Sequence, residues 1–297
     1  MQTTTELSKC LNARQDEYRY LLLDPLKKVA SWNPLHAARL NESKRKDALQ
    51  RVLRPDLAWS PEHCPLLLLL ASPGEQCDEE LILSSEEYAR GEMLYEKRYV
   101  CGWLSSKYNP GTMAEWLADL CRKIKSGSVI PVFEPLRLEL LQITSDKDVL
   151  SRLLNPVSDW HILGSVGELI TLSGQVDSGK WLLNWGTEHA QSEARNIWHL
   201  LALWKEITTS LPSDATRLAV QAWSKSNREG FHHLSDRSYL ALNFLTLPVD
   251  ITRHNAVKLL LREAVSNPEQ RFTQLLRTLP DTVWQELKHG MRDAKEK

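Results

Sequence analysis

The spacing of the apolar residues changes part-way along the chain, near residue 185. Before that point, apolar positions form short continuous runs, most of them stopped by Pro or Gly, which is typical of buried strands. Strands are therefore predicted at 18–23, 65–71, 99–104 and 129–133.

Helices are predicted between these strands. Thr112 and Glu115 have the spacing of a capping box and precede an apolar stripe of helical period, which predicts a helix over 112–125. The segment 79–97 is also expected to be helical. The mostly polar segment 42–53 is expected to form a surface helix or helical loop.

Two further runs, 161–166 and 168–172, flank a turn that contains glycine and predict a hairpin. Beyond residue 188, apolar positions recur every three to four residues, as in amphipathic helices. Together these patterns predict an α/β (α+β) N-terminal lobe over 1–185, followed by an all-α C-terminal lobe over 186–297.

Charge and composition narrow the class of function. Among 297 residues, 37 Lys and Arg stand against 38 Asp and Glu, so the net charge is −1. Proteins that bind nucleic acid or anionic membranes usually carry a basic excess, so neither nucleic-acid binding nor direct membrane insertion is expected. The five cysteines include no Cys-x-x-Cys pair, which is typical of a reducing compartment. Because no secretory-signal pattern opens the sequence, a cytoplasmic protein is expected.

One segment has the spacing of a phosphate-binding loop. Gly174, Gly179 and Lys180 fit G-x-x-x-x-G-K, but Trp181 stands where a hydroxyl residue should hold magnesium. The His and Cys residues match no common zinc spacing. We therefore expect no catalytic, metal or cofactor site, and we predict that the chain is not an enzyme and that Lys180 binds no phosphate. A nucleotide-binding enzyme that uses 174–180 stays open as an alternative.

Tryptophan is unusually frequent, since eleven of the 22 aromatic residues are Trp. Trp198, Trp204 and Trp223 fall on helical stripes and are expected in the core. Trp181 and Trp185 lie in a short segment that cannot bury both rings in a helical core, and Trp is enriched at protein interfaces. Few basic residues accompany them, which argues against stacking on nucleic-acid bases. We therefore expect Trp181 and Trp185 to bind a partner protein.

A series of motifs appears in a fixed order between residues 18 and 172. An apolar strand ends in an acidic-proline step, a glycine–tryptophan strand ends in a serine pair, a second apolar run ends in an acidic-proline step with an arginine after it, and a tryptophan follows the next helix. The positions concerned are Asp24, Pro25, Trp103, Ser105, Ser106, Glu134, Pro135, Arg137 and Trp160.

In this order and type of motif, the chain resembles the adaptor (chaperone) family of bacterial type VI secretion systems. The helical segment 219–247 also fits that family loosely. Two positions depart from the family pattern: Glu134 stands where an Asp is usual, and Leu136 stands where the Arg is expected, with Arg137 one place later.

The resemblance implies a function without catalysis. Adaptors of this family bind a toxic effector protein and help to load it onto the tip-spike protein of the injection apparatus. The expected partners are therefore an effector and the tip-spike protein. A different helical protein-binding scaffold, or an immunity-type protein, stays open as a further alternative.

Overall fold

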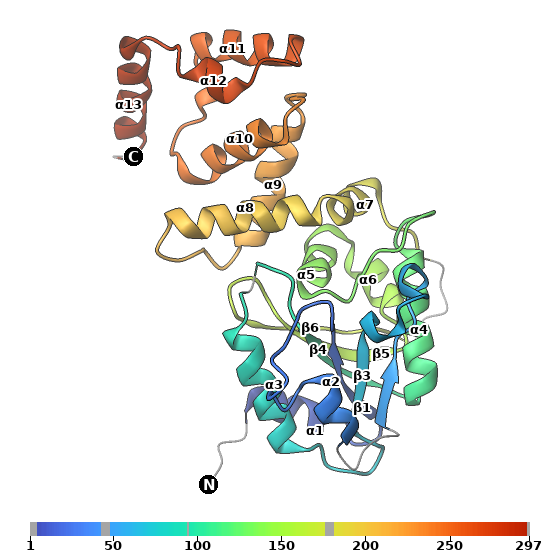
Figure 1. The fold of residues 1–297 in the computed structure, drawn as a ribbon. Coiled ribbons are helices and arrows are strands. Elements are labelled where there is room, and N and C mark those ends of the chain that lie inside the picture. The colour runs from blue at the N-terminus through green and yellow to red at the C-terminus, as the bar shows by residue number, and fades with distance from the viewer. Residues whose placement is uncertain (1–4, 43–47, 94, 176–180, 296–297) are drawn as a thin grey trace. The chain divides into compact units, whose positions relative to one another are not determined.

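The structure is a computed structural model that describes residues 5–42, 48–93, 95–175 and 181–295, with side chains to residue 289 (Figure 1). The chain divides into two compact units, Met1–Ala194 and Arg195–Lys297, and each is described by itself. The mixed α/β class predicted from the sequence is confirmed, because a six-stranded sheet is combined with many helices.

The first unit is built on one antiparallel sheet with the strand order β2-β3-β1-β4-β5-β6. Its strands are β1 (Tyr18–Leu23), β2 (Leu49–Arg51), β3 (Leu66–Ala71), β4 (Val100–Ser106), β5 (Val157–Leu163) and β6 (Leu169–Leu172). The first strand lies in the middle of the sheet, where Leu21 pairs with Leu68 on one side and with Trp103 on the other.

Helices cover both faces of this sheet (Figure 1). One face is covered by α1 (Glu6–Asn12), α2 (Ala37–Glu42) and α3 (Glu79–Gly91), and the other by α4 (Pro110–Lys123), α5 (Pro135–Thr144) and α6 (Lys147–Leu153). Leu21 and Leu23 of β1 belong to the first core, whereas Tyr20 and Leu22 belong to the second. Burial on both faces is why β1 has a continuous apolar run instead of alternation.

Three shorter elements complete the first unit. The 3₁₀ turns η2 (Pro55–Leu57) and η3 (Pro61–His63) connect β2 to β3, and α7 (Trp185–Ser192) packs on α5. The whole of α7 therefore belongs to the first unit, which ends at Ala194.

Most of the predicted strands are confirmed, with ends that move by a few residues. The strand predicted at 129–133 is wrong: residues 129–131 have no regular structure, and residues 132–133 form a turn that leads into α5. Pro135 takes the first position of that helix, where its missing N–H removes no helical hydrogen bond.

The helix predicted over 42–53 is also wrong where the structure describes it. Residues 49–51 form the edge strand β2, because β3 offers Leu66, Leu67 and Leu68 as hydrogen-bonding partners. Residues 43–47 lie outside the described residues. The cap predicted for α4 is wrong as well, since Asn109 caps this helix by accepting a hydrogen bond from the Thr112 N–H at 3.1 Å.

The described elements of the second unit are helical. They are α8 (Ala194–Ile207), which begins at the boundary, α9 (Ala215–Asn227), α10 (Leu234–Thr246), η4 (Ile251–Arg253), α11 (Asn255–Ser266), α12 (Phe272–Leu276) and α13 (Asp281–Lys295). Their core contains Phe231 and Phe272, whose ring centroids are 5.1 Å apart. Trp204 and Trp223 are buried as predicted, and Trp198 is half-buried.

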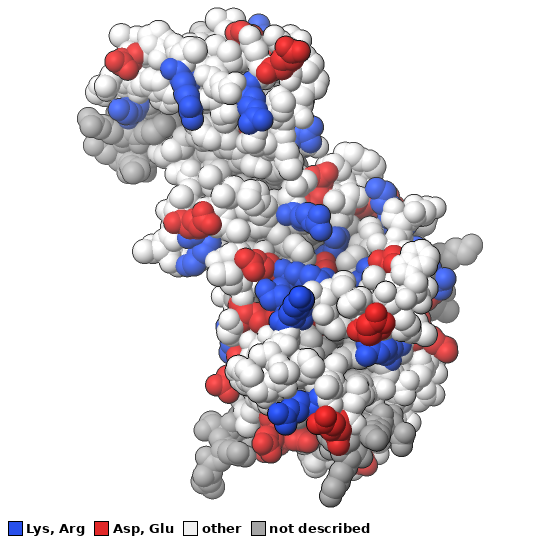
Figure 2. All heavy atoms as spheres, in the orientation of Figure 1, with Lys and Arg blue, Asp and Glu red and all other residues white. Residues whose placement is uncertain are grey.

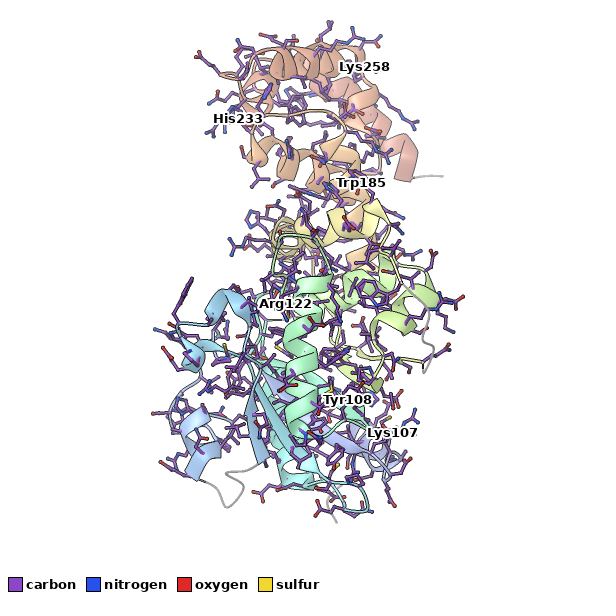
Figure 3. The ribbon with its side chains drawn as sticks, turned by 90° about the vertical axis from the view of Figure 1, so that its right-hand side faces the viewer. Lys107, Tyr108, Arg122, Trp185, His233 and Lys258 are labelled. Atoms are coloured by element: carbon purple, nitrogen blue, oxygen red, sulfur yellow. The ribbon has the colours of Figure 1, made fainter. Side chains whose placement is uncertain are left out.

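Polar side chains at the start of α10 form hydrogen bonds to the backbone at and before the start of α12. The buried carboxylate of Asp236 on α10 accepts hydrogen bonds from the N–H groups of Phe272 (3.0 Å) and Thr273 (3.1 Å), which satisfies the first turn of α12. His233, labelled in Figure 3, precedes α10 and places its Nε2 2.8 Å from the Pro268 carbonyl oxygen. Among the described residues, no helix is both long and apolar enough to cross a lipid bilayer.

The close approach of two strands at Gly102 predicts that Gly102→Ala strongly lowers the stability of the protein. Gly102 has φ +131°, and a Cβ there would lie 2.5 Å from the carbonyl oxygen of His161 on the neighbouring strand. We expect a loss of about 3 kcal/mol in the free energy of unfolding, measured by urea denaturation. As the control, Gly111→Ala in α4 meets only ordinary contact at 3.6 Å and should leave stability unchanged or raise it. Equal stabilities for the two variants would contradict this packing argument.

His161 predicts a pH dependence of stability. Burial lowers the pKa of this imidazole below its ordinary value of 6.5, and the neighbouring Asp159 only partly offsets the effect. As the pH falls, the unfolded chain therefore binds the proton before the folded protein does. The contribution of neutral His161 to the free energy of unfolding is complete above about pH 6.5 and is lost as the pH falls toward the folded-state pKa. Between about pH 7.5 and pH 5.5 the free energy of unfolding of the wild-type protein should therefore fall more than that of His161→Asn. Identical pH profiles for the two proteins would contradict the assignment.

Candidate functional site

The turn after β1 buries a carboxylate at the edge of the core. Asp24 is fully buried, and its backbone N–H donates to the Tyr99 carbonyl oxygen at 2.7 Å. Its Oδ1 accepts a hydrogen bond from the Leu26 N–H at 3.0 Å, closing a turn around Pro25. The second carboxylate oxygen is thereby left to face the interior of the first unit.

Lys97 joins the two acidic-proline motifs. Its Nζ lies 2.7 Å from Asp24 Oδ2 and 2.7 Å from Glu134 Oε1, and Glu134 is only 5% exposed. Burial lowers the pKa of Lys97, but the charges of Glu134 and Asp24 outweigh burial, so the pKa is raised above its ordinary value. The amine is therefore held in its charged form between two carboxylates.

Arg137 and Gln191 extend this arrangement to two helices. Glu134 Oε2 accepts a hydrogen bond from Arg137 Nε at 2.8 Å, one turn further along α5. Arg137 Nη1 then donates to the Gln191 carbonyl oxygen at 2.6 Å, while Gln191 Nε2 donates to the Arg137 carbonyl oxygen at 2.9 Å. We name Asp24, Lys97, Glu134, Arg137 and Gln191 the motif cluster.

The geometry of α5 brings Arg137 to Glu134. Positions three apart lie on the same face of a helix, so Arg137 faces Glu134 once α5 begins at Pro135. Leu136, between Pro135 and Arg137, is 1% exposed and part of the core.

The motif cluster is neutral and closed. Two carboxylates face two cations, and both Asp24 and Gln191 are fully buried, so the charged groups bind one another. A buried network of this kind stabilises a fold little more than apolar side chains of the same volume would. Removal of one member is nevertheless costly, because it leaves a buried charge without its partner. The motif cluster thus joins the turn after β1, the start of α5 and α7 through ion pairs and hydrogen bonds.

The glycine–tryptophan motif lies in the sheet. Trp103 is fully buried, and its Nε1 donates to Ser85 Oγ on α3 at 2.9 Å. Trp160 is fully buried on the opposite face, in the core formed with α4 to α6. Ser106 Oγ donates to the Pro156 carbonyl oxygen at 2.9 Å, and Ser105 is buried beside it. These four motif positions are therefore part of the core and its turns.

The tryptophans that we expected to bind a partner differ in exposure. Trp185, at the start of α7 (Figure 3), is 78% exposed, and its ring stacks on His189 with a centroid distance of 5.0 Å. Trp181 is half-buried and packs against the core shared with α4 to α6. The neighbouring Leu182 is 86% exposed. Trp185 and Leu182 are thus exposed apolar side chains, whereas Trp181 packs on the core.

The segment with phosphate-loop spacing is described only at its ends. Lys180 and the residues 176–179 lie outside the described residues. Gly174 donates its N–H to the Val157 carbonyl oxygen at 3.0 Å, and the helix that follows begins only at Trp185. The Asn184 side chain accepts a hydrogen bond from the Thr187 N–H at 2.9 Å and so caps this helix itself.

Sequence reasoning missed two members of the motif cluster, Lys97 and Gln191. Neither belongs to a motif, and each contacts residues far away along the chain. The signal for Lys97 was the pair of acidic-proline steps, since two carboxylates buried after apolar runs require a cation between them.

Other candidate chemistry finds no support in the part of the chain that is described. There, no group of three or more His, Cys, Asp or Glu side chains is arranged to hold a metal ion. Four of the five cysteines are buried, as expected for small apolar residues. Comparisons with known proteins find no matching family model, no similar curated protein and no similar solved structure.

The motif cluster predicts a large stability loss for Lys97→Met. The substitution keeps the apolar part of the side chain but leaves Asp24 and Glu134 without their shared cation. We expect a loss of about 3 kcal/mol in the free energy of unfolding. The matched control is Lys123→Met, which removes one of the two cations that pair with Asp119 on the exposed face of α4 and should cost less than about 1 kcal/mol. A similar loss in both variants would contradict a special role for Lys97.

Proposed function

We propose that this chain is a non-enzymatic cytoplasmic adaptor, which binds a toxic effector protein and helps to load it onto the tip-spike protein of a type VI secretion system. The observation that carries the proposal is the convergence of Asp24 and Glu134 on Lys97. These acids come from two separate motifs of the resemblance. Because the two motifs meet in one cluster, they belong to one structural unit, and this supports the resemblance on which the proposal rests.

An adaptor must hold its cargo firmly and then release it at the spike. This requirement favours an interface with a few aromatic anchors and a polar rim. The exposed ring of Trp185, next to Leu182, has the chemistry of such an anchor. In this proposal an α/β lobe over 1–185 and a helical lobe over 186–297 form the adaptor, and Trp181 and Trp185 contribute to its effector surface.

The proposal is tested by co-expressing the chain with the effector and spike proteins whose genes lie beside its own. A complex that contains this chain and the effector, and that then accepts the spike, is the expected result. Absence of any complex between the chain and that effector would overturn the proposal.

Trp185→Ala separates binding from folding. Because the ring is 78% exposed, its removal should change the melting temperature little, while effector binding should weaken by about 2 kcal/mol. Trp59→Ala is the control, since Trp59 is 85% exposed elsewhere on the first unit. Titration calorimetry measures both affinities. Normal effector binding by a well-folded Trp181→Ala/Trp185→Ala variant would remove this surface from the proposal.

A further inference from the structure

A second surface with an exposed aromatic side chain lies on the first unit. A groove of about 620 Å³ runs between the loop after β1 and the end of α3. We name it the Trp32 groove. Trp32 and Pro34 line it from the loop, and Tyr88 and Met93 line it from the other side. Trp32 is 76% exposed and Met93 is 56% exposed.

The loop that carries Trp32 is fixed from within. Leu35 is 1% exposed, and its carbonyl oxygen accepts a hydrogen bond from the Tyr99 hydroxyl at 2.6 Å. Asn33 Oδ1 accepts from the Leu35 N–H at 2.8 Å, and the Asn33 N–H donates to the Ala30 carbonyl oxygen at 2.9 Å. The loop is thus held in one conformation while the indole ring points outward. An aromatic group held in this way loses little entropy when it binds a partner.

The charge of the groove is acidic. Among the described residues, Glu87, Glu92 and Glu96 line it together with one cation, Lys27. Figure 2 shows the two signs of charge interspersed over the visible face of the molecule, so an excess of three carboxylates over one ammonium group is a local feature.

The three carboxylates of the groove differ in how strongly they interact with the rest of the protein. Glu92 accepts hydrogen bonds from the N–H groups of Tyr99 (2.6 Å) and Val100 (3.2 Å), which fixes its position. Glu96 lies 3.6 Å from Lys27 in an exposed pair of little strength. Glu87 is exposed on α3 and has no ion-pair partner among the described residues. Glu87 and Glu96 are therefore available to a cation from outside.

An exposed indole beside carboxylates selects for a particular chemistry. Trp is the strongest cation–π partner among the side chains, and a guanidinium stacks on an aromatic ring while it pairs with a carboxylate. Phosphate backbones and anionic lipids are repelled by the same carboxylates. The apolar surface of Met93 and Pro34 calls for an apolar group next to the cation.

We propose that the Trp32 groove binds a segment of a partner protein in which an Arg or Lys side chain lies next to an apolar one. The cation lies against the Trp32 ring and pairs with Glu87 and Glu96, and the apolar side chain packs on Met93. The inference rests on the proposed adaptor function only for the identity of that partner.

Selection from a phage-displayed library of random peptides, with the full-length chain as bait, tests the groove without a known partner. Enriched peptides are expected to carry Arg or Lys beside an apolar residue. Their affinity, measured by fluorescence anisotropy, should fall about tenfold or more in Trp32→Ala and in Glu87→Lys. The matched controls are Trp59→Ala and Glu115→Lys, both at exposed positions outside the groove, and these should bind as the wild-type chain does. Melting temperatures of all four variants check the fold.

Exchange of the charges between the peptide and the groove tests the predicted ion pair directly. A peptide in which the basic residue is replaced by Glu should bind Glu87→Lys better than it binds the wild-type chain. The proposal is overturned if no peptide is enriched, if the enriched peptides lack basic residues, or if Trp32→Ala binds them as tightly as the wild-type chain.

Failure of the groove and failure of the adaptor function have different signatures. Selection of basic peptides by a chain that forms no complex with the neighbouring effector supports the groove and overturns the adaptor function. An effector complex formed by a chain that enriches no basic peptide does the reverse.

Discussion

Coverage of the sheet on both faces is the constraint from which the rest of the first unit follows. A strand between two helical layers has no solvent-facing side, so a polar group that is buried where such a strand ends needs a polar or charged partner. This happens directly after Leu23, where the fully buried Asp24 ends the central strand. A carboxylate at that place needs a cation, and Lys97 supplies one that Glu134 shares. The ion pairs of the motif cluster are therefore a consequence of how the apolar core is arranged.

The acidic-proline step has a physical meaning in this arrangement. Proline restricts the residue before it to extended backbone, and Glu134 has φ −62° and ψ 130°. An acid in this position stays outside the following turn or helix, with its side chain free to point into the core. Glu134 makes no capping hydrogen bond to α5, because Lys97 and Arg137 occupy its carboxylate oxygens. The same step thus ends one element and provides an anchor for another.

The sequence allowed the central strands to be predicted because burial on both faces produces continuous apolar runs of strand length, such as 66–71. The run 129–133 has a similar composition but is a buried turn, with Val132 and Phe133 in the core, since a short apolar run does not reveal its backbone conformation. The edge strand β2 could not be predicted either, because its residues pair with β3 and carry no pattern of their own. Lys97 was missed for a related reason: an ion pair between distant parts of the chain leaves no local spacing to detect.

Four tryptophans of the first unit form two pairs with different degrees of burial. Trp103 and Trp160 are fully buried and fill the two cores, so packing accounts for them. Trp32 and Trp185 expose most of their surface, and little of the apolar area that stabilises the fold depends on them. Stability alone gives no reason for so large an apolar side chain at these exposed positions, and the same holds for Trp59. Trp32 and Trp185 are held on a fixed loop and at a capped helix end, so each indole would lose little freedom on contact with a partner. The two cores therefore depend on the buried tryptophans, and Trp32 and Trp185 can be substituted without removing a side chain from either core.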